Sequence, residues 1–154
     1  MLNIVGSILI ERPAEVVFDY LADQRNELEY NPEMIRSEKM TNGPIGVGTR
    51  FAATVKSRGR PTDMLIEVTE FDRPARFGTR TTMSSADIEG VLTLAPQGAG
   101  TRMSWAWQLR PKGALKVLRP LMAVMGRRQE QRIWAAMKKK LETSSATPAK
   151  KGGR

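Results

Sequence analysis

Residues 2–23 read LNIVGSILIERPAEVVFDYLAD and pass from the hydrophobic period of a strand to that of a helix. Four of the apolar side chains in the first nine of them share one face at period two, at Leu2, Ile4, Ile8 and Ile10. This alternation is typical of a half-buried strand. Pro13 suits the start of a helix, because its missing N–H needs no partner there, and Val17 and Leu21 follow at helical spacing. We therefore predict a strand over 2–10 and a helix from Pro13 to near Asp23.

The next part of the chain has the composition of an antiparallel meander. A short helix or turn is expected over 26–30, because Pro32 disfavours a helical residue before it. Strand-like segments then alternate with short groups of Gly, Pro, Asn and Ser, the residue types that tight turns use. We place six strands at 34–41, 49–58, 62–71, 75–83, 87–95 and 101–110. Short connections of this kind join antiparallel neighbours.

From Pro111 onward the apolar residues take helical spacing, at Leu118, Met122, Met125, Ile133, Met137 and Leu141. This pattern predicts a long amphipathic C-terminal helix, which Pro120 and Gly126 should bend or divide. The periodicity ends after residue 142. We expect one domain over 1–142 and a disordered basic tail over 143–154.

The composition removes several kinds of chemistry. The chain contains no cysteine and no histidine, so disulfides, Ser-His or Cys-His nucleophile pairs and ordinary zinc sites are excluded. We expect no cofactor and no metal. Strand alternation places the ionisable strand residues on the outer face, including Asp63, Glu67, Asp87 and Glu89. No acid or base is thus predicted to face inward, and no residue is predicted to be catalytic; the polar groups left to meet a ligand are Tyr20, Tyr30, Gln108, Thr79 and Thr81.

The net charge of +9 is distributed unevenly. Residues 1–90 sum to −3 and residues 91–154 to +12. The basic residues of the last helix could dock the protein on an anionic membrane, and they are Lys112, Lys116, Arg119, Arg127, Arg128, Lys138, Lys139 and Lys140. They could equally be a solvated helix face with a basic tail. Nucleic-acid binding is not expected, because no recognition motif accompanies the charge.

The localisation follows from two missing features. The N-terminus lacks the basic start and the unbroken apolar run of a signal peptide, and no apolar stretch is long enough to span a bilayer. We expect a soluble, cytoplasmic protein.

Several short motifs resemble one superfamily. They are IERPAEVVFDYLAD at 10–23, EYNP at 29–32, VGTRF at 47–51, EVTEFDRP at 67–74 and GTRMSW at 100–105. With the order of the expected elements, residues 1–142 resemble the START, Bet v 1 and polyketide-cyclase-like superfamily (SRPBCC), in its polyketide cyclase/dehydrase-like branch. The resemblance implies an α+β helix-grip fold, in which a curved antiparallel sheet wraps around the long C-terminal helix.

The resemblance also implies a cavity between the sheet and that helix, which holds a small apolar ligand. The residues expected to contact the ligand are those of the apolar strand face and the facing helix: Phe51, Met64, Ile66, Phe77, Thr79, Thr81, Met83, Trp105, Trp107, Met122 and Met125. The same side chains could instead fill a solid core. Binding or transport of a lipid, polyketide or similar molecule is the favoured function. The alternatives are a cyclase or dehydratase without metal and a module that docks on membrane surfaces.

Overall fold

The computed structural model describes residues 2–57, 59–113, 117 and 119–144. The first elements are β1 (Leu2–Ile10), α1 (Ala14–Ala22) and a 3-10 helix, η1 (Gln24–Glu29). Six strands and a helix follow: β2 (Met34–Lys39), β3 (Arg50–Ser57), β4 (Arg60–Asp72), β5 (Arg76–Met83), β6 (Ala86–Gln97), β7 (Gly100–Pro111) and α2 (Arg119–Ser144). The order predicted from the sequence, one strand, two short helices, six strands and a long helix, is therefore confirmed.

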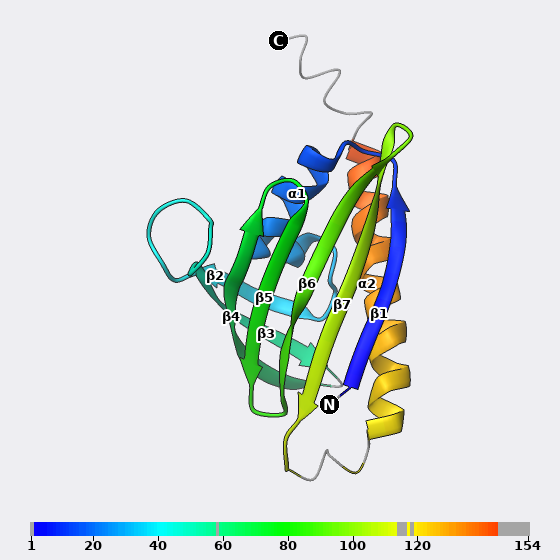
Figure 1. Ribbon diagram of the computed structural model, residues 1–154. Helices are drawn as coiled ribbons and strands as arrows, with labels where there is room; N and C mark the ends of the chain where they lie inside the picture. Colours follow the sequence, from blue (N-terminus) through cyan, green and yellow to red (C-terminus); the bar gives the residue numbers. More distant parts are fainter. Residues whose placement is uncertain (1, 58, 114–116, 118, 145–154) are drawn as a thin grey trace.

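The seven strands form one antiparallel sheet in the order β1-β7-β6-β5-β4-β3-β2 (Figure 1). Each strand from β2 to β7 pairs with its neighbour in the chain, and β1 closes onto β7. Irregular register near Met34 in β2 and between Val68 and Glu70 in β4 interrupts two of the ladders. Such irregularities increase local twist, which suits a sheet that must curve around a helix.

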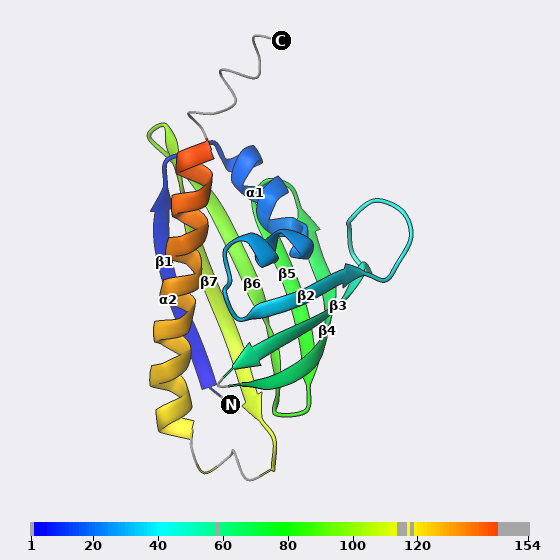
Figure 2. The same cartoon turned by 180° about the vertical axis from the view of Figure 1, so that it is seen from behind.

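The helices lie on the concave side of this sheet (Figure 2). α2 runs along β1, its main contact in the sheet, while η1 contacts β2 and α1 contacts β6 and β7. The curved antiparallel sheet around a C-terminal helix, and with it the helix-grip fold, is confirmed.

The convex face carries the ionisable strand residues, as the alternation predicts. Arg80 pairs there with Glu89 at 3.4 Å and with Glu67 at 3.7 Å. Arg50 is exposed on the same face. Neither arginine reaches the interior, so neither adds a positive charge to the concave side of the sheet.

α2 is one continuous helix, which corrects the expectation that Pro120 and Gly126 divide it. Pro120 is the second helical residue, where its missing N–H needs no partner. Gly126 lies against β1: a Cβ there would stand 2.6 Å from Ile4 Cδ1. Gly126 thus allows α2 to pack closely against β1 and does not interrupt the helix. Residues 143 and 144 of the predicted tail belong to α2, and the rest of the tail lies outside the described residues.

Candidate functional site

A cavity of about 450 Å³ lies between the concave face of the sheet and the part of α2 from Met122 to Trp134. Its walls come from all seven strands, from η1 and from the segment that joins η1 to β2. The lining is mainly apolar. Its charged members among the described residues are Glu27, Glu33 and Glu130, with no lysine or arginine.

Nine of the eleven side chains expected at the ligand line this cavity: Met64, Ile66, Phe77, Thr79, Thr81, Met83, Trp107, Met122 and Met125. The alternation along β4, β5 and β7 therefore identified the inner face correctly. Their contact with a ligand stays a prediction.

Phe51 and Trp105 do not line the cavity, although both point inward. They are 0% and 2% exposed and belong to the main hydrophobic core. Trp134 packs against Trp105, with ring centroids 6.1 Å apart, and it is Trp134 that lines the cavity. Period-two spacing gives the face of a strand residue, but what packs over that residue decides whether it reaches a cavity.

Two glycines make room for the inward tryptophans of β7. Gly6 pairs with Trp105 across the β1–β7 ladder, and Gly90 pairs with Trp107 across β6–β7. A Cβ on Gly6 would lie 2.7 Å from Trp105 Cε2, and one on Gly90 would lie 2.7 Å from Trp107 Cε3. Glycine in a strand weakens it but allows this close approach. The two indoles thus occupy space that glycines in the neighbouring strands leave open.

Glu130 is held by these aromatic residues. Its Oε1 accepts a hydrogen bond from Trp107 Nε1 at 2.6 Å and another from Trp134 Nε1 at 3.0 Å. Burial raises the pKa of Glu130, and the two indole donors oppose that rise without cancelling it. Oε2 of Glu130 forms no hydrogen bond with any described residue, and it is not a fully buried atom. One oxygen is therefore fixed while the other stays accessible.

Glu27 is the second carboxyl group of this region. Its Oε2 accepts a hydrogen bond from Asn31 Nδ2 at 2.7 Å. Burial raises the pKa of Glu27 to about 7; the bond from Asn31 opposes this, and the negative charge of Glu130 adds to it. The negative charge of Glu130 therefore disfavours ionisation of Glu27, and burial disfavours the ionised form of both carboxyl groups.

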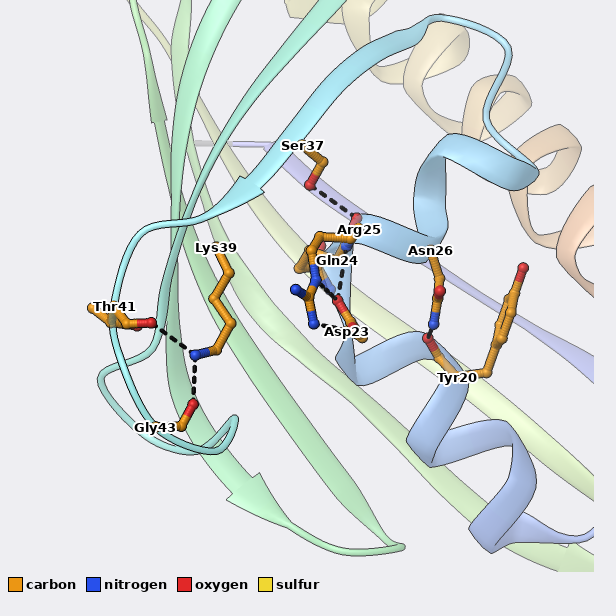
Figure 3. A network of polar contacts seen from close by, with 9 residues as sticks. All are labelled: Tyr20, Asp23, Gln24, Arg25, Asn26, Ser37, Lys39, Thr41 and Gly43. Carbon is orange, nitrogen blue, oxygen red and sulfur yellow. Dashed lines mark hydrogen bonds and ion pairs between the residues drawn. The ribbon is translucent and has the colours of Figure 1, made fainter.

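A polar network fixes the segment that carries Glu27 (Figure 3). Asp23 caps η1 by accepting from the backbone N–H of Arg25 at 3.1 Å. Asn26 Nδ2 donates to the carbonyl of Tyr20 in α1 at 2.9 Å, and Ser37 Oγ in β2 donates to the carbonyl of Gln24 at 3.1 Å. Bonds to a helix on one side and a strand on the other keep η1 in place over the cavity.

Tyr30 follows η1 and lies beside both carboxyl groups. It is 7% exposed, lines the cavity and stacks at a tilt on Trp134, with centroids 6.1 Å apart. Its hydroxyl forms no hydrogen bond with a described residue. Burial, followed by the negative charges of Glu27 and other neighbours, raises the pKa of Tyr30 well above its ordinary value. The phenol therefore stays neutral and keeps its hydrogen-bonding capacity.

The inward carboxyl groups overturn the expectation that no acid or base faces the cavity. Glu27 lies in a short 3-10 segment without periodicity, so its direction could not be inferred from the sequence. For Glu130, the helical spacing in the sequence does indicate the inward direction of the side chain. The apolar residues of the final helix leave a gap of eight between Met125 and Ile133, and Glu130, four residues before Trp134, falls on the same helical face.

The other polar candidates are divided between the cavity and the surface. Thr79 and Thr81 line the cavity and Gln108 is exposed on the opposite face. Tyr20 lies outside the lining and donates to Glu29 at 2.5 Å.

The basic residues of the C-terminal part serve two different purposes. Lys112 donates to the carbonyl of Met83 at 2.9 Å, and Lys138 donates to the carbonyl of Leu9 at 2.8 Å. These two lysines join elements of the fold. Exposed cations remain at Arg127, Arg128, Lys139 and Lys140. Lys116 lies outside the described residues, as does the side chain of Arg119.

Two further kinds of feature are absent from the described residues. No three acidic, histidine or cysteine side chains gather closely enough there to hold a metal ion. None of the described helices combines the length and the hydrophobicity that crossing a membrane requires.

Comparison with known families agrees with the resemblance in the sequence. The family model described as "Polyketide cyclase / dehydrase and lipid transport" matches residues 1–142. A sequence comparison with curated proteins gives no match.

Solved structures share the fold at low sequence identity. A protein of Thermus thermophilus is 19% identical with a TM-score of 0.80, covering 93% of this chain and 99% of that one. A START superfamily protein of Mycobacterium smegmatis is 13% identical with a TM-score of 0.80, covering 92% and 97%. The Zhui aromatase/cyclase of a Streptomyces species is 14% identical with a TM-score of 0.75, covering 93% and 94%. These likenesses establish the fold.

Proposed function

Because the chain belongs to the polyketide cyclase / dehydrase and lipid transport family, we propose that it binds and carries a small hydrophobic molecule in the cavity under α2. The observation that carries this proposal is the cavity itself. Its volume of about 450 Å³ lies within the range of small-molecule sites, about 300–1,000 Å³. The family description suggests a lipid, a polyketide or a similar guest.

A homologous series of straight-chain alcohols tests the proposal by calorimetry. Each buried CH₂ contributes ~0.8 kcal/mol, so the affinity should rise about fourfold per added carbon. The rise should stop once the cavity is full. An affinity independent of chain length, or a rise without a limit, would contradict an apolar site of limited size.

Adjacent threonines supply a matched pair of variants. Thr81 lines the cavity, whereas Thr82 is exposed on the opposite face of β5. Thr81→Trp should fill part of the cavity and shorten the longest alcohol that binds. Thr82→Trp adds the same bulk outside and should leave the series unchanged.

Pick-up of the ligand at an anionic membrane is a second candidate function, supported by the first turns of α2. Leu121, Val124 and Met125 are 54%, 41% and 46% exposed, and Met125 also lines the cavity. Arg127 and Arg128 follow directly and are exposed. Apolar and basic side chains in one short stretch suit a surface of anionic lipid, where each cation contributes about 1 kcal/mol.

Co-sedimentation with phosphatidylcholine vesicles, with and without phosphatidylserine, tests this second function. Retention should need phosphatidylserine, fall with salt and weaken in Leu121→Glu. Equal retention on neutral and anionic vesicles would contradict the proposal. Leu65→Glu, at an exposed leucine of the sheet, is the matched control.

A reaction on the bound guest is supported by Glu27, whose pKa of about 7 allows proton exchange near neutrality. A cyclase or dehydratase would convert a supplied polyketide-like substrate. Glu27→Gln should then abolish turnover while binding persists.

A further inference from the structure

The charge inside the cavity is opposite to that of the protein. The chain carries a net charge of +9, yet the charged groups in the described lining are the carboxyls of Glu27, Glu33 and Glu130. No lysine or arginine of the described lining compensates them. Gln129 Nε2 donates to Glu33 Oε1 at 3.1 Å, and the hydrogen bonds to Glu27 and Glu130 likewise come from neutral donors. A guest in this cavity therefore meets uncompensated acceptors.

Aromatic rings surround the same acceptors. Trp107, Trp134 and Tyr30 all line the cavity, and both indoles bond to one oxygen of Glu130. Because the indoles fix the carboxylate, its other oxygen can receive a ligand without reorganisation of the side chain. Aromatic faces attract cations by about 0.5–2 kcal/mol, and more strongly when water is excluded.

Tyr30 adds a neutral polar group at the same place. The residue is 7% exposed and lines the cavity, and its hydroxyl forms no hydrogen bond with any described residue. The hydroxyl is not a fully buried atom, so it is open to a guest. It can accept a hydrogen bond from an N–H donor placed at the carboxyl groups.

We propose that the cavity selects apolar molecules that carry a protonated amine, with the ammonium group placed among Glu27, Glu130, Tyr30 and the two indoles. This inference rests on the proposed binding function and names the class of its ligand. An ammonium gains charge-assisted hydrogen bonds and cation–π contacts there. A carboxylate or phosphate gains neither and is repelled. A neutral alcohol of the same length uses only the apolar wall and a single hydrogen bond.

The test compares four molecules with one alkyl chain: decylamine, decyltrimethylammonium, 1-decanol and decanoate, titrated into the full-length protein by calorimetry. Decylamine should bind at least about tenfold more tightly than 1-decanol. Decanoate should bind most weakly. Decyltrimethylammonium, which keeps the charge but lacks N–H donors, should fall between decylamine and the alcohol.

Variants assign the preference to the carboxyl groups. Glu130→Gln and Glu27→Gln keep a carbonyl oxygen for the present donors and remove the charge. Each should lower the affinity for decylamine by about tenfold and change that for 1-decanol by less than about threefold. The matched control is Glu89→Gln, which removes the same charge from an exposed site on β6 and should change neither. Circular dichroism verifies that each variant is folded.

The outcomes separate this inference from the proposed function. If 1-decanol and decanoate bind as tightly as decylamine, the preference for amines is wrong and the hydrophobic site stands. If none of the four binds, both proposals are wrong. If the preference persists in both glutamine variants, the carboxyl groups do not recognise the amine and the inference fails.

Discussion

The interior of this protein is solid at one end and hollow at the other, although one sheet and one helix form both. At the solid end α1 and the C-terminal half of α2 meet the sheet, and Phe18, Met137 and Leu141 are almost completely buried. At the hollow end Met122 and Met125 of α2 face the cavity, and Met125 is 46% exposed. The difference indicates that the two ends have different roles. The solid end holds the fold together and leaves the hollow end free to keep groups that cost stability.

The largest expected difference between the two ends is in the stability lost when each inward tryptophan of β7 is replaced by alanine. Trp105→Ala removes a ring that is 2% exposed and should lower the free energy of unfolding by about 3–5 kcal/mol. Trp107 faces the cavity, so Trp107→Ala should cost less than half as much. Urea denaturation followed by circular dichroism measures both. Equal losses would mean that the hollow end is as important for stability as the solid one.

An added methyl group gives a second comparison, of intermediate size. In Gly6→Ala the new Cβ meets the packed indole of Trp105, and we expect a loss of about 1–3 kcal/mol. In Gly126→Ala it meets the side chain of Ile4, where only the terminal Cδ1 lies too close and can rotate away, and the higher helix propensity of alanine offsets about 1 kcal/mol. Thermal unfolding should place the second variant near the wild type. A larger loss for Gly126→Ala than for Gly6→Ala would contradict this ranking.

The pH dependence of stability should show the cost of Glu27. Its pKa is about 7 in the folded state against 4.5 ordinarily, so the folded protein binds more protons between these values. Stability contributed by this group is thus full below about pH 4.5 and lost as the pH rises through about 7. Glu27→Gln removes the loss and should raise the free energy of unfolding by about 1–3 kcal/mol at about pH 8.

The same gain should vanish at about pH 3, well below the ordinary pKa of 4.5, because the wild-type carboxyl is neutral there in both states. Denaturation at the two pH values provides the measurement, with Glu89→Gln as the control for the change in net charge. A variant that is no more stable than the wild type at the higher pH would refute the burial cost.

Binding of a permanent cation should depend on the ionisation of Glu27. We expect this effect to be the smallest of the four predicted here. The affinity for decyltrimethylammonium should rise by up to about tenfold from about pH 6 to 8, as Glu27, with a pKa of about 7, loses its proton. Tyr30 stays neutral and Glu33 adds a further acidic group; the chain has no histidine to titrate in this range. Calorimetry in buffers of different ionisation enthalpy should detect the released protons. A flat profile would contradict the role of the carboxyl groups.

The sequence was sufficient for the fold because local signals repeat consistently along it. Alternation in 2–10, Pro13 at the helix start and turn residues between the six later strands each agree with the same topology. The inner face followed from the same alternation, which is why Met64, Thr79 and Trp107 were correctly expected at the cavity. Phe51 and Trp105 were misplaced because burial depth depends on tertiary packing, which no spacing encodes.

The polar end of the cavity could not be predicted so directly. The sequence shows Glu27 in a segment without period, and only the network around η1 turns it inward. Glu130 interrupts an apolar stripe, and such an interruption on a buried helical face is the signal of a functional polar group. A charged residue that fills a gap in an otherwise apolar helical face therefore merits attention even when every other pattern indicates a plain core.

The position of the indoles affects the intrinsic fluorescence of the protein. The three tryptophans of the chain lie in one contiguous group: Trp107 and Trp134 line the cavity and donate to the same carboxylate, and Trp105, in the core, packs against Trp134. Emission from indole depends on nearby charge and on the polarity of its surroundings. Any guest that reaches Glu130 changes both at once, so the unlabelled protein reports the arrival of its own ligand through its intrinsic fluorescence.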